Sequence, residues 1–218
     1  MSEIKNFDTG IPIESGIKII NLDPKENILN KKKIRNILKK ISESNLDDLS
    51  HNIKNAYHEN AEIFAFHPVN ELKGVDEIID TLWKPLIYSF PDLERRDNLI
   101  IGGSFQNRVY VSTVGHLTGT FAHPWLGVPS NGKTIHLRIC EVHQIENEKI
   151  INSHILIDIM DFIRQAGFWP VNPSLGIEEM WPGPITGDGT TFENLDSNLS
   201  ATTLDQGLTM QRSLNIKP

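Results

Sequence analysis

The sequence has very little cysteine. Cys140 is the only one among 218 residues, so the chain can form no internal disulfide and offers no cluster of thiolates to a metal. No pair of histidines at helical spacing accompanies it, and we therefore expect neither a metal nor a cofactor. Cys140 lies in the middle of an expected strand, where we interpret it as a small buried apolar side chain rather than a nucleophile.

Long apolar runs and an excess of positive charge are also missing. No run approaches the roughly 20 apolar residues that cross a bilayer, and residues 1–10 are polar and acidic, unlike a secretion signal. We therefore expect a cytoplasmic protein without a membrane partner. The net charge of -7 argues against a nucleic-acid partner, because such proteins carry a basic patch or stripe. The lysines between Lys31 and Lys40 lie on an expected helix, where we interpret them as a solvated face.

What the sequence does contain is two kinds of periodicity, one after the other. Helical spacing of apolar residues predicts helices at about 24–42, 46–57 and 74–90, with Pro85 kinking or shortening the third. Alternating spacing predicts strands at about 62–67, 93–101, 108–121, 134–145 and 150–158. A short helix at 159–166 follows the last strand. This order indicates an α+β fold, with helices packed on one side of a curved, largely antiparallel sheet.

The predicted hairpin between Thr134 and Asp158 holds the most chemically reactive side chains. Because successive side chains of a strand point to opposite faces, Glu141 and His143 share a face with the apolar residues of the first strand. On the second strand, Asp158 shares a face with His154. Asp158 also stands just before the last helix, where an aspartate commonly caps the first turn. A capping role and a catalytic role therefore both stay open for Asp158.

Several short motifs follow one another between residues 46 and 170. They are Tyr57-His58-Glu59-Asn60-Ala61, Phe90-Pro91-Asp92-Leu93-Glu94, Gly115-His116-Leu117-Thr118-Gly119-Thr120-Phe121, Leu126-Gly127-Val128-Pro129-Ser130-Asn131-Gly132-Lys133 and Arg164-Gln165-Ala166-Gly167. Together, and in this order, they resemble the SnoaL-like polyketide cyclases of the nuclear transport factor 2-like superfamily, to which ketosteroid isomerase also belongs. Two positions depart from the family pattern: the hairpin turn has no glycine, and His154 stands where tryptophan is frequent.

The resemblance implies a cone-shaped curved antiparallel sheet wrapped on N-terminal helices, a nuclear transport factor 2-like barrel that opens at one end to an apolar pocket. It also implies a homodimer and a small hydrophobic molecule as ligand. We divide the chain into an N-terminal arm with an extra helix at 1–44, the SnoaL-like domain at 45–170, and a Pro- and Gly-rich wrap with a flexible tail at 171–218. Trp181 is the residue of the wrap that we expect to dock.

By resemblance, Asp158 is the general acid/base of an intramolecular aldol condensation, for which burial in an apolar pocket would have to raise its pKa. His143 and His116 are candidate helpers that polarise a carbonyl or pass a proton. The alternative for each is an imidazole satisfied by the protein itself. Glu141 either orients His143 or pairs in the neighbourhood of Arg138. Candidate substrate-binding residues, most of them alternatively plain core or loop residues, are Tyr57, Phe66, Trp83, Phe90, Trp125, Glu141 and His154.

Two classes of function remain from the sequence alone. The first is a cofactor-independent enzyme of the cyclase, isomerase or lyase type, acting by acid/base catalysis on a small hydrophobic carbonyl compound in polyketide metabolism. The second is a non-catalytic module of the same fold that binds a small ligand or mediates oligomerisation, because a fold by itself does not determine function. The placement of Asp158 distinguishes the two: an enzyme needs this carboxylate inside a closed pocket with a second polar group within reach, whereas in a binding module it could point at backbone amides with no cavity beyond it.

Overall fold

The structure is a computed structural model that describes residues 23–105, 107–169, 172, 187, 189–192 and 197–214. In chain order its elements are α1 (Pro24–Ser42), α2 (Leu46–Ala56), β1 (Tyr57–Ala65), β2 (Glu71–Lys73), α3 (Val75–Glu77), η1 (Ile78–Trp83), α4 (Lys84–Ser89), β3 (Glu94–Phe105), β4 (Arg108–Thr120), β5 (Thr134–Glu146), β6 (Lys149–Ile157), α5 (Ile159–Gln165) and α6 (Ser197–Leu214).

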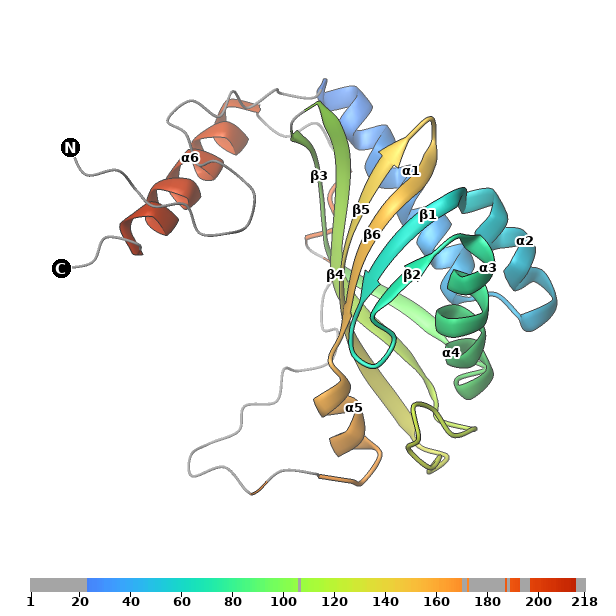
Figure 1. Ribbon diagram of the computed structural model, residues 1–218. Helices are drawn as coiled ribbons and strands as arrows, with labels where there is room; N and C mark the ends of the chain where they lie inside the picture. The colour runs from blue at the N-terminus through green and yellow to red at the C-terminus, as the bar shows by residue number, and fades with distance from the viewer. Residues whose placement is uncertain are drawn as a thin grey trace.

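The strands form one open sheet with the order β2-β1-β6-β5-β4-β3. Neighbouring strands are antiparallel except β1 and β6, which run parallel. The sheet is therefore mixed rather than purely antiparallel, because β1 lies beside the last strand of the chain. Helices α1 to α4 cover one face of the curved sheet (Figure 1). We call this the inner face, and the opposite one the outer face.

The predicted helices are confirmed, and their ends have local causes. Asp23 and Asn45 cap α1 and α2, since each side-chain oxygen accepts a hydrogen bond from a backbone N–H of the first turn,. The third predicted helix consists of α3, η1 and α4 in succession. Its irregularity is a π-helical turn from Ile78 to Trp83. The turn lies directly before Pro85, which has no N–H to donate to a regular α-helix.

The strands are also confirmed; β1 and β3 are each three residues longer than predicted, and the others agree to within one residue at each end. The three-residue strand β2, paired with β1, was not predicted because it is too short to show a period. The β5–β6 turn places both Asn147 and Glu148 at positive φ, 47° and 66°. This is the conformation of a two-residue hairpin turn that normally favours asparagine followed by glycine.

The core lies between the helices and the inner face. On the apolar side of α1, the side chains of Ile34, Leu38 and Ile41 are completely buried. At the end of the sheet next to α5, aromatic rings pack edge to face or stacked. Phe90 and Phe121 lie 5.1 Å apart between centroids, and Trp125 and Phe162 lie 5.0 Å apart. We call these four rings, with Phe66, the aromatic cluster.

A short segment from Gly189 to Phe192, which we call the strap, joins the edge of the sheet to α1. The carbonyl oxygen of Gly189 accepts a hydrogen bond of 3.0 Å from the N–H of Ile100 in β3. Lys31 donates to the carbonyl oxygen of Thr191 at 2.7 Å and lies over the ring of Phe192. Lys31 is buried, and burial lowers the pKa of its ammonium group. The interpretation of the whole lysine run as a solvated face is therefore wrong at Lys31.

The two ends of the chain are described only in part. The N-terminal arm at residues 1–22 and the expected docking residue Trp181 lie outside the described residues. In the segment expected to be a flexible tail, residues 197–214 form α6, which the sequence analysis did not predict. Within the described part of the chain, no helix is both long and apolar enough to cross a membrane.

Candidate functional site

Side chains with hydrogen-bonding groups gather in the middle of the inner face. Each has at most 5% of its surface exposed. We call this group the inner cluster, and it consists of Tyr57, Trp83, Arg95, Thr113, Glu141, His143 and Ser153.

The register of the sheet explains why the inner cluster forms. Glu141 and His143 alternate with outward residues on β5, so both face inward. Thr113 of β4 stands directly opposite Glu141, and Ser153 of β6 stands directly opposite His143. Arg95 joins them from β3. Neighbours across strands lie about 5 Å apart, which places these polar groups within reach of one another.

Arg95 is the centre of the charged part of the cluster. Its Nη2 donates to Glu141 Oε2 and, at 2.7 Å, to Thr113 Oγ1. Its Nε donates to Asp97 Oδ1 at 2.8 Å. Asp97 in turn lies 3.4 Å from the guanidinium of Arg35, whose side chain is 41% exposed. Two arginines therefore balance two carboxylates, and the Arg95–Glu141 pair is completely buried.

His143 lies between two polar partners. Its Nδ1 is 2.8 Å from Ser153 Oγ, and its Nε2 is 3.8 Å from Glu141 Oε2. The imidazole is completely buried. Burial acts to raise the pKa of Glu141, but Arg95 and His143 outweigh it and hold the pKa well below its usual range. Glu141 is therefore an ionised carboxylate rather than a proton donor.

Several atoms of the cluster are buried without a hydrogen-bond partner. They are Tyr57 Oη, Trp83 Nε1, Arg95 Nη1, Glu141 Oε1 and His143 Nε2. Buried polar atoms are paired in the great majority of cases, and leaving one unpaired costs about 1–3 kcal/mol. A concentration of such atoms in one place is what an internal binding site would require.

Tyr57 connects this cluster to the surface. Burial raises the pKa of its hydroxyl far above the usual range, and the charge of Glu141 adds to the effect. Ser153, Arg95 and Trp83 lower it, so the hydroxyl lies among the other members of the cluster. The same residue forms part of the wall of a surface cleft of ≈ 470 Å³, which is lined by Lys54, Tyr57, Glu59, Lys73, Gly74, Val75, Asp76, Glu77 and Lys149.

A second cleft, of ≈ 590 Å³, lies between residues of β1, β4, β5 and β6. None of its lining residues belongs to the inner cluster. It is lined mainly by polar and charged side chains near the β5–β6 turn, and no unpaired buried atom points to a ligand there. We therefore do not place the candidate site in this cleft.

Asp158 lies on the outer face. It is the N-cap of α5, where its Oδ1 accepts a hydrogen bond of 3.0 Å from the N–H of Asp161, so the capping role is confirmed. Its Oδ2 lies 3.5 Å from Arg138, and 33% of the side chain is exposed. Leu156, on the same face of β6, is 63% exposed, so it does not enclose the carboxylate. The structure thus separates Asp158 from Glu141 and His143 by the thickness of the sheet.

His116 is also on the outer face, where it stands opposite Arg138. It is buried, and its Nδ1 lies 3.3 Å from Asn98 Oδ1. Burial lowers the pKa of its imidazole, and the charges of Arg138 and His136 add to this. His116 and Asp158 therefore share one neighbourhood through Arg138. Glu141 does not pair near Arg138, because the sheet lies between them.

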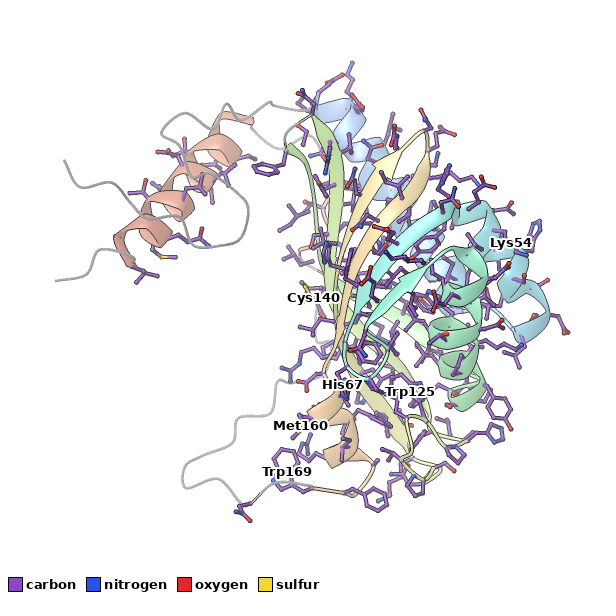
Figure 2. All side chains as sticks on the ribbon, viewed as in Figure 1. Lys54, His67, Trp125, Cys140, Met160 and Trp169 are labelled. Atoms are coloured by element: carbon purple, nitrogen blue, oxygen red, sulfur yellow. The ribbon has the colours of Figure 1, made fainter. Side chains whose placement is uncertain are left out.

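The remaining predicted residues fall into three places. Tyr57 and Trp83 belong to the inner cluster. Phe66, Phe90 and Trp125 belong to the aromatic cluster. His154 is exposed on the outer face, where its ring stacks on that of Phe64 at 5.1 Å. Cys140 is half-buried rather than fully buried, on the side of the sheet away from helices α1 to α4 (Figure 2).

Comparison with known proteins identifies the family of this chain. The family model of the SnoaL-like polyketide cyclases matches residues 34–166, well over half of the chain. The chain belongs to the SnoaL-like polyketide cyclase family. No curated protein matches its sequence.

Two solved structures show the same fold. A proposed SnoaL-like polyketide cyclase from Jannaschia sp. CCS1 has a TM-score of 0.53 at 16% identity, covering 65% of this chain and 93% of its own. Wild-type IdmH from Streptomyces antibioticus, a proposed polyketide cyclase, has a TM-score of 0.50 at 15% identity, covering 64% and 99%. At this level of sequence identity, the similarity of this chain to both structures shows the fold alone.

The sequence did not reveal Arg95, Thr113 and Ser153 as members of the inner cluster. The alternation along β3 held a signal, because Arg95 stands two residues after the buried Leu93 and therefore on the same side. Thr113 and Ser153 could be found only through the register of β4 and β6. Among the described residues, no group of three or more His, Cys, Asp or Glu is arranged to hold a metal ion.

Proposed function

We propose that this SnoaL-like chain is a cofactor-independent enzyme of the cyclase or isomerase type. It would move protons on a small hydrophobic carbonyl compound bound at the inner cluster. The observation that carries the proposal is the set of buried, unpaired polar atoms around His143. A core selected for stability alone gains nothing from such atoms, whereas an apolar site with a few convergent polar groups is typical of small-molecule binding.

In this proposal His143 carries the proton. Ser153 fixes its Nδ1 side, and the ionised Glu141 lies on its Nε2 side. Nε2 takes the proton from the carbon next to the substrate carbonyl. The C–H electron pair forms the C=C bond of an enolate, and the carbonyl electron pair moves to oxygen. When the carbon has attacked a second carbonyl or the double bond has shifted, the imidazolium returns its proton to the new alkoxide or carbon.

Tyr57 and Trp83 supply the groups that an enolate oxygen needs. Both carry a buried donor that makes no hydrogen bond of good geometry, the hydroxyl Oη and the indole Nε1, although Ser153 and Trp83 contact the hydroxyl. Donors already held in place stabilise a developing oxyanion more in a buried site than in water, because no solvent has to reorganise. Their proximity to Glu141 and Ser153 places them next to the proposed proton carrier.

The catalytic role expected for Asp158 stays a prediction. Its carboxylate already accepts the N–H at the start of α5 and faces Arg138, which are the contacts of a structural residue. If Asp158 and His116 nevertheless carry the chemistry, the substrate would have to bind on the outer face. The experiment that tests the proposal therefore compares the two faces directly.

The test uses exchange of carbon-bound hydrogen, which requires no knowledge of the final product. The full chain is incubated in D₂O with a panel of enolisable ketones and oxo acids, and loss of the proton next to the carbonyl is followed by NMR. We expect the native protein to accelerate exchange for part of the panel. His143→Gln should abolish the acceleration, while Asp158→Asn and the exposed control His154→Gln should retain it.

Two outcomes would contradict the proposal. Loss of exchange in Asp158→Asn, with exchange kept in His143→Gln, would place the chemistry on the outer face. Binding of panel members without exchange would favour the non-catalytic ligand-binding module. The homodimer implied by the resemblance also stays a prediction, and light scattering of the purified chain would test it.

A further inference from the structure

The structure points to a particular class of substrate. We infer that the substrate carries a carboxylate beside the reacting carbonyl, and that Nη1 of Arg95 binds this carboxylate within the inner cluster. The inference rests on the proposed function, because it assumes that substrate binds at the cluster. It goes further by dividing the donors: Arg95 holds the acid group, and Tyr57 with Trp83 holds the oxygen of the carbonyl.

Arg95 has one more donor group than its protein partners use. Its Nε donates to Asp97, and its Nη2 donates to Glu141 and Thr113. Nη1 is buried with no partner, although the side chain is 0% exposed. Nη1 carries two N–H groups, and a hydrogen bond from a guanidinium to a carboxylate is about twice as strong as one between neutral groups. An arginine needed only to neutralise Glu141 would not have to leave Nη1 unpaired.

The charges near the cluster determine how an anion can be accepted. Arg95 and Arg35 balance Glu141 and Asp97, so a carboxylate would add one uncompensated negative charge. The charged groups nearest to Arg95 Nη1 on the protein side are Glu141 and Asp97, which Arg95 already contacts through Nη2 and Nε. A monocarboxylate adds a single negative charge there, whereas a phosphate dianion would add two.

The surroundings are suited to an apolar body attached to the acid group. Ile139 precedes Glu141 on the same face of β5, and Ile155 stands opposite Glu141 on β6. Both are buried. On the other side, Tyr57 separates the cluster from the ≈ 470 Å³ cleft that also contains Lys54, Lys73 and Lys149. Glu59, Asp76 and Glu77 line the same cleft, and Lys54 pairs with Asp76 at 3.1 Å, so the charges around its opening are balanced.

The inference is tested by binding of an acid and its neutral ester to the full chain. The probes are 3-benzoylpropionate and methyl 3-benzoylpropionate, which share the ketone and the ring and differ in that the ester is uncharged and carries one more methyl group. A hydrogen bond to a charged group contributes roughly tenfold or more in affinity. By calorimetry we expect the acid to bind at least tenfold more tightly than the ester. Equal affinity for the two, or tighter binding of the ester, would overturn the inference.

Substitution of Arg95 has to be designed around its structural role. Arg95→Gln alone would leave Glu141 buried without its partner, so the variant to use is Arg95→Gln combined with Glu141→Gln. Neutral replacement of both members of a buried pair is often tolerated. This double variant should lose the preference for the acid and keep the affinity for the ester. A preserved preference would show that another group binds the carboxylate.

Tyr57→Phe supplies a second variant that keeps the bulk of the side chain. It should weaken acid and ester alike, because Tyr57 is assigned to the ketone oxygen, whereas the matched Tyr110→Phe outside the cluster should change neither. If Tyr57→Phe weakens only the acid, the division of donors is wrong.

The exchange assay separates the two proposals: exchange of neutral ketones without preference for acids would leave the proposed function standing and remove this inference. Preference for the acid without exchange would leave this inference standing and remove the proposed function.

Discussion

The two faces of the sheet carry similar residues in different surroundings. The inner face holds Glu141 and His143 in a closed core, with an ion pair to Arg95 that joins residues 46 positions apart. The outer face holds the partly exposed Asp158 and the buried His116 beside Arg138. A carboxylate and an imidazole occur on both sides, so residue type does not distinguish the faces. The burial of the carboxylate and the unpaired polar atoms around it distinguish the inner face from the outer face.

The largest expected difference between the faces concerns removal of a carboxylate charge. Glu141→Gln leaves Arg95 buried and only partly compensated, which should lower the free energy of unfolding by about 3–5 kcal/mol. Asp158→Asn on the outer face should lower it by less than about 1 kcal/mol, because a partly exposed ion pair contributes little. Urea denaturation of both variants measures this, and similar losses would mean that the faces do not differ as described.

The pH dependence of stability should reflect the same contrast. The pKa of Glu141 in the folded chain lies below its unfolded value of about 4.3,. Its stabilising effect is therefore complete above that value and is lost as pH falls through the lower, folded pKa. Native protein should lose stability steeply below about pH 5, and Glu141→Gln less steeply. Equal slopes in urea titrations between pH 3 and 7 would contradict the assignment.

A smaller effect is expected from the cap of α5. Asp158→Ala removes the acceptor for the N–H of Asp161 and should cost about 1 kcal/mol, whereas Asp158→Asn keeps a capping oxygen and should cost a few tenths. Thermal and urea unfolding of the pair would show it. If alanine and asparagine are equally destabilising, charge pairing with Arg138 matters more than capping.

The smallest effect compares two hydroxyls. Tyr57→Phe removes an unpaired buried hydroxyl and should leave stability unchanged or raise it by up to about 1 kcal/mol. Thr118→Val removes a hydroxyl that is paired with His136 at 3.0 Å on the outer face, and should cost about 1 kcal/mol. A marked loss of stability in Tyr57→Phe would show that its hydroxyl has a structural partner.

The sequence was sufficient for the elements and for the faces of the hairpin. Periods of two and 3.6 located most strands and helices, and the alternation on β5 correctly placed Glu141 and His143 together. The side of the sheet that the helices cover was not determined by these patterns. For that reason Asp158 and His116 could be grouped with His143 before the structure separated them.

What was missed depended on contacts between distant parts of the chain. The Arg95–Glu141 pair requires the register of β3, β4 and β5, which no local pattern gives. Lys31 reads as a solvated lysine because its partner, the carbonyl of Thr191, lies 160 residues away. The strand β2 is too short for a period, and α6 lies in a segment whose composition resembles a tail.

The strap has a consequence for how the chain avoids self-association. Strand β3 is at the edge of the sheet, and an uncovered edge is a template for strand addition by another molecule. The carbonyl oxygen of Gly189 accepts the hydrogen bond from the N–H of Ile100. Contacts between Lys31 and the strap, including the ring of Phe192, hold the segment on α1. The family match ends at residue 166, so a chain cut there would lose this cover. The residues beyond the family domain thus pair with part of the open edge of the sheet.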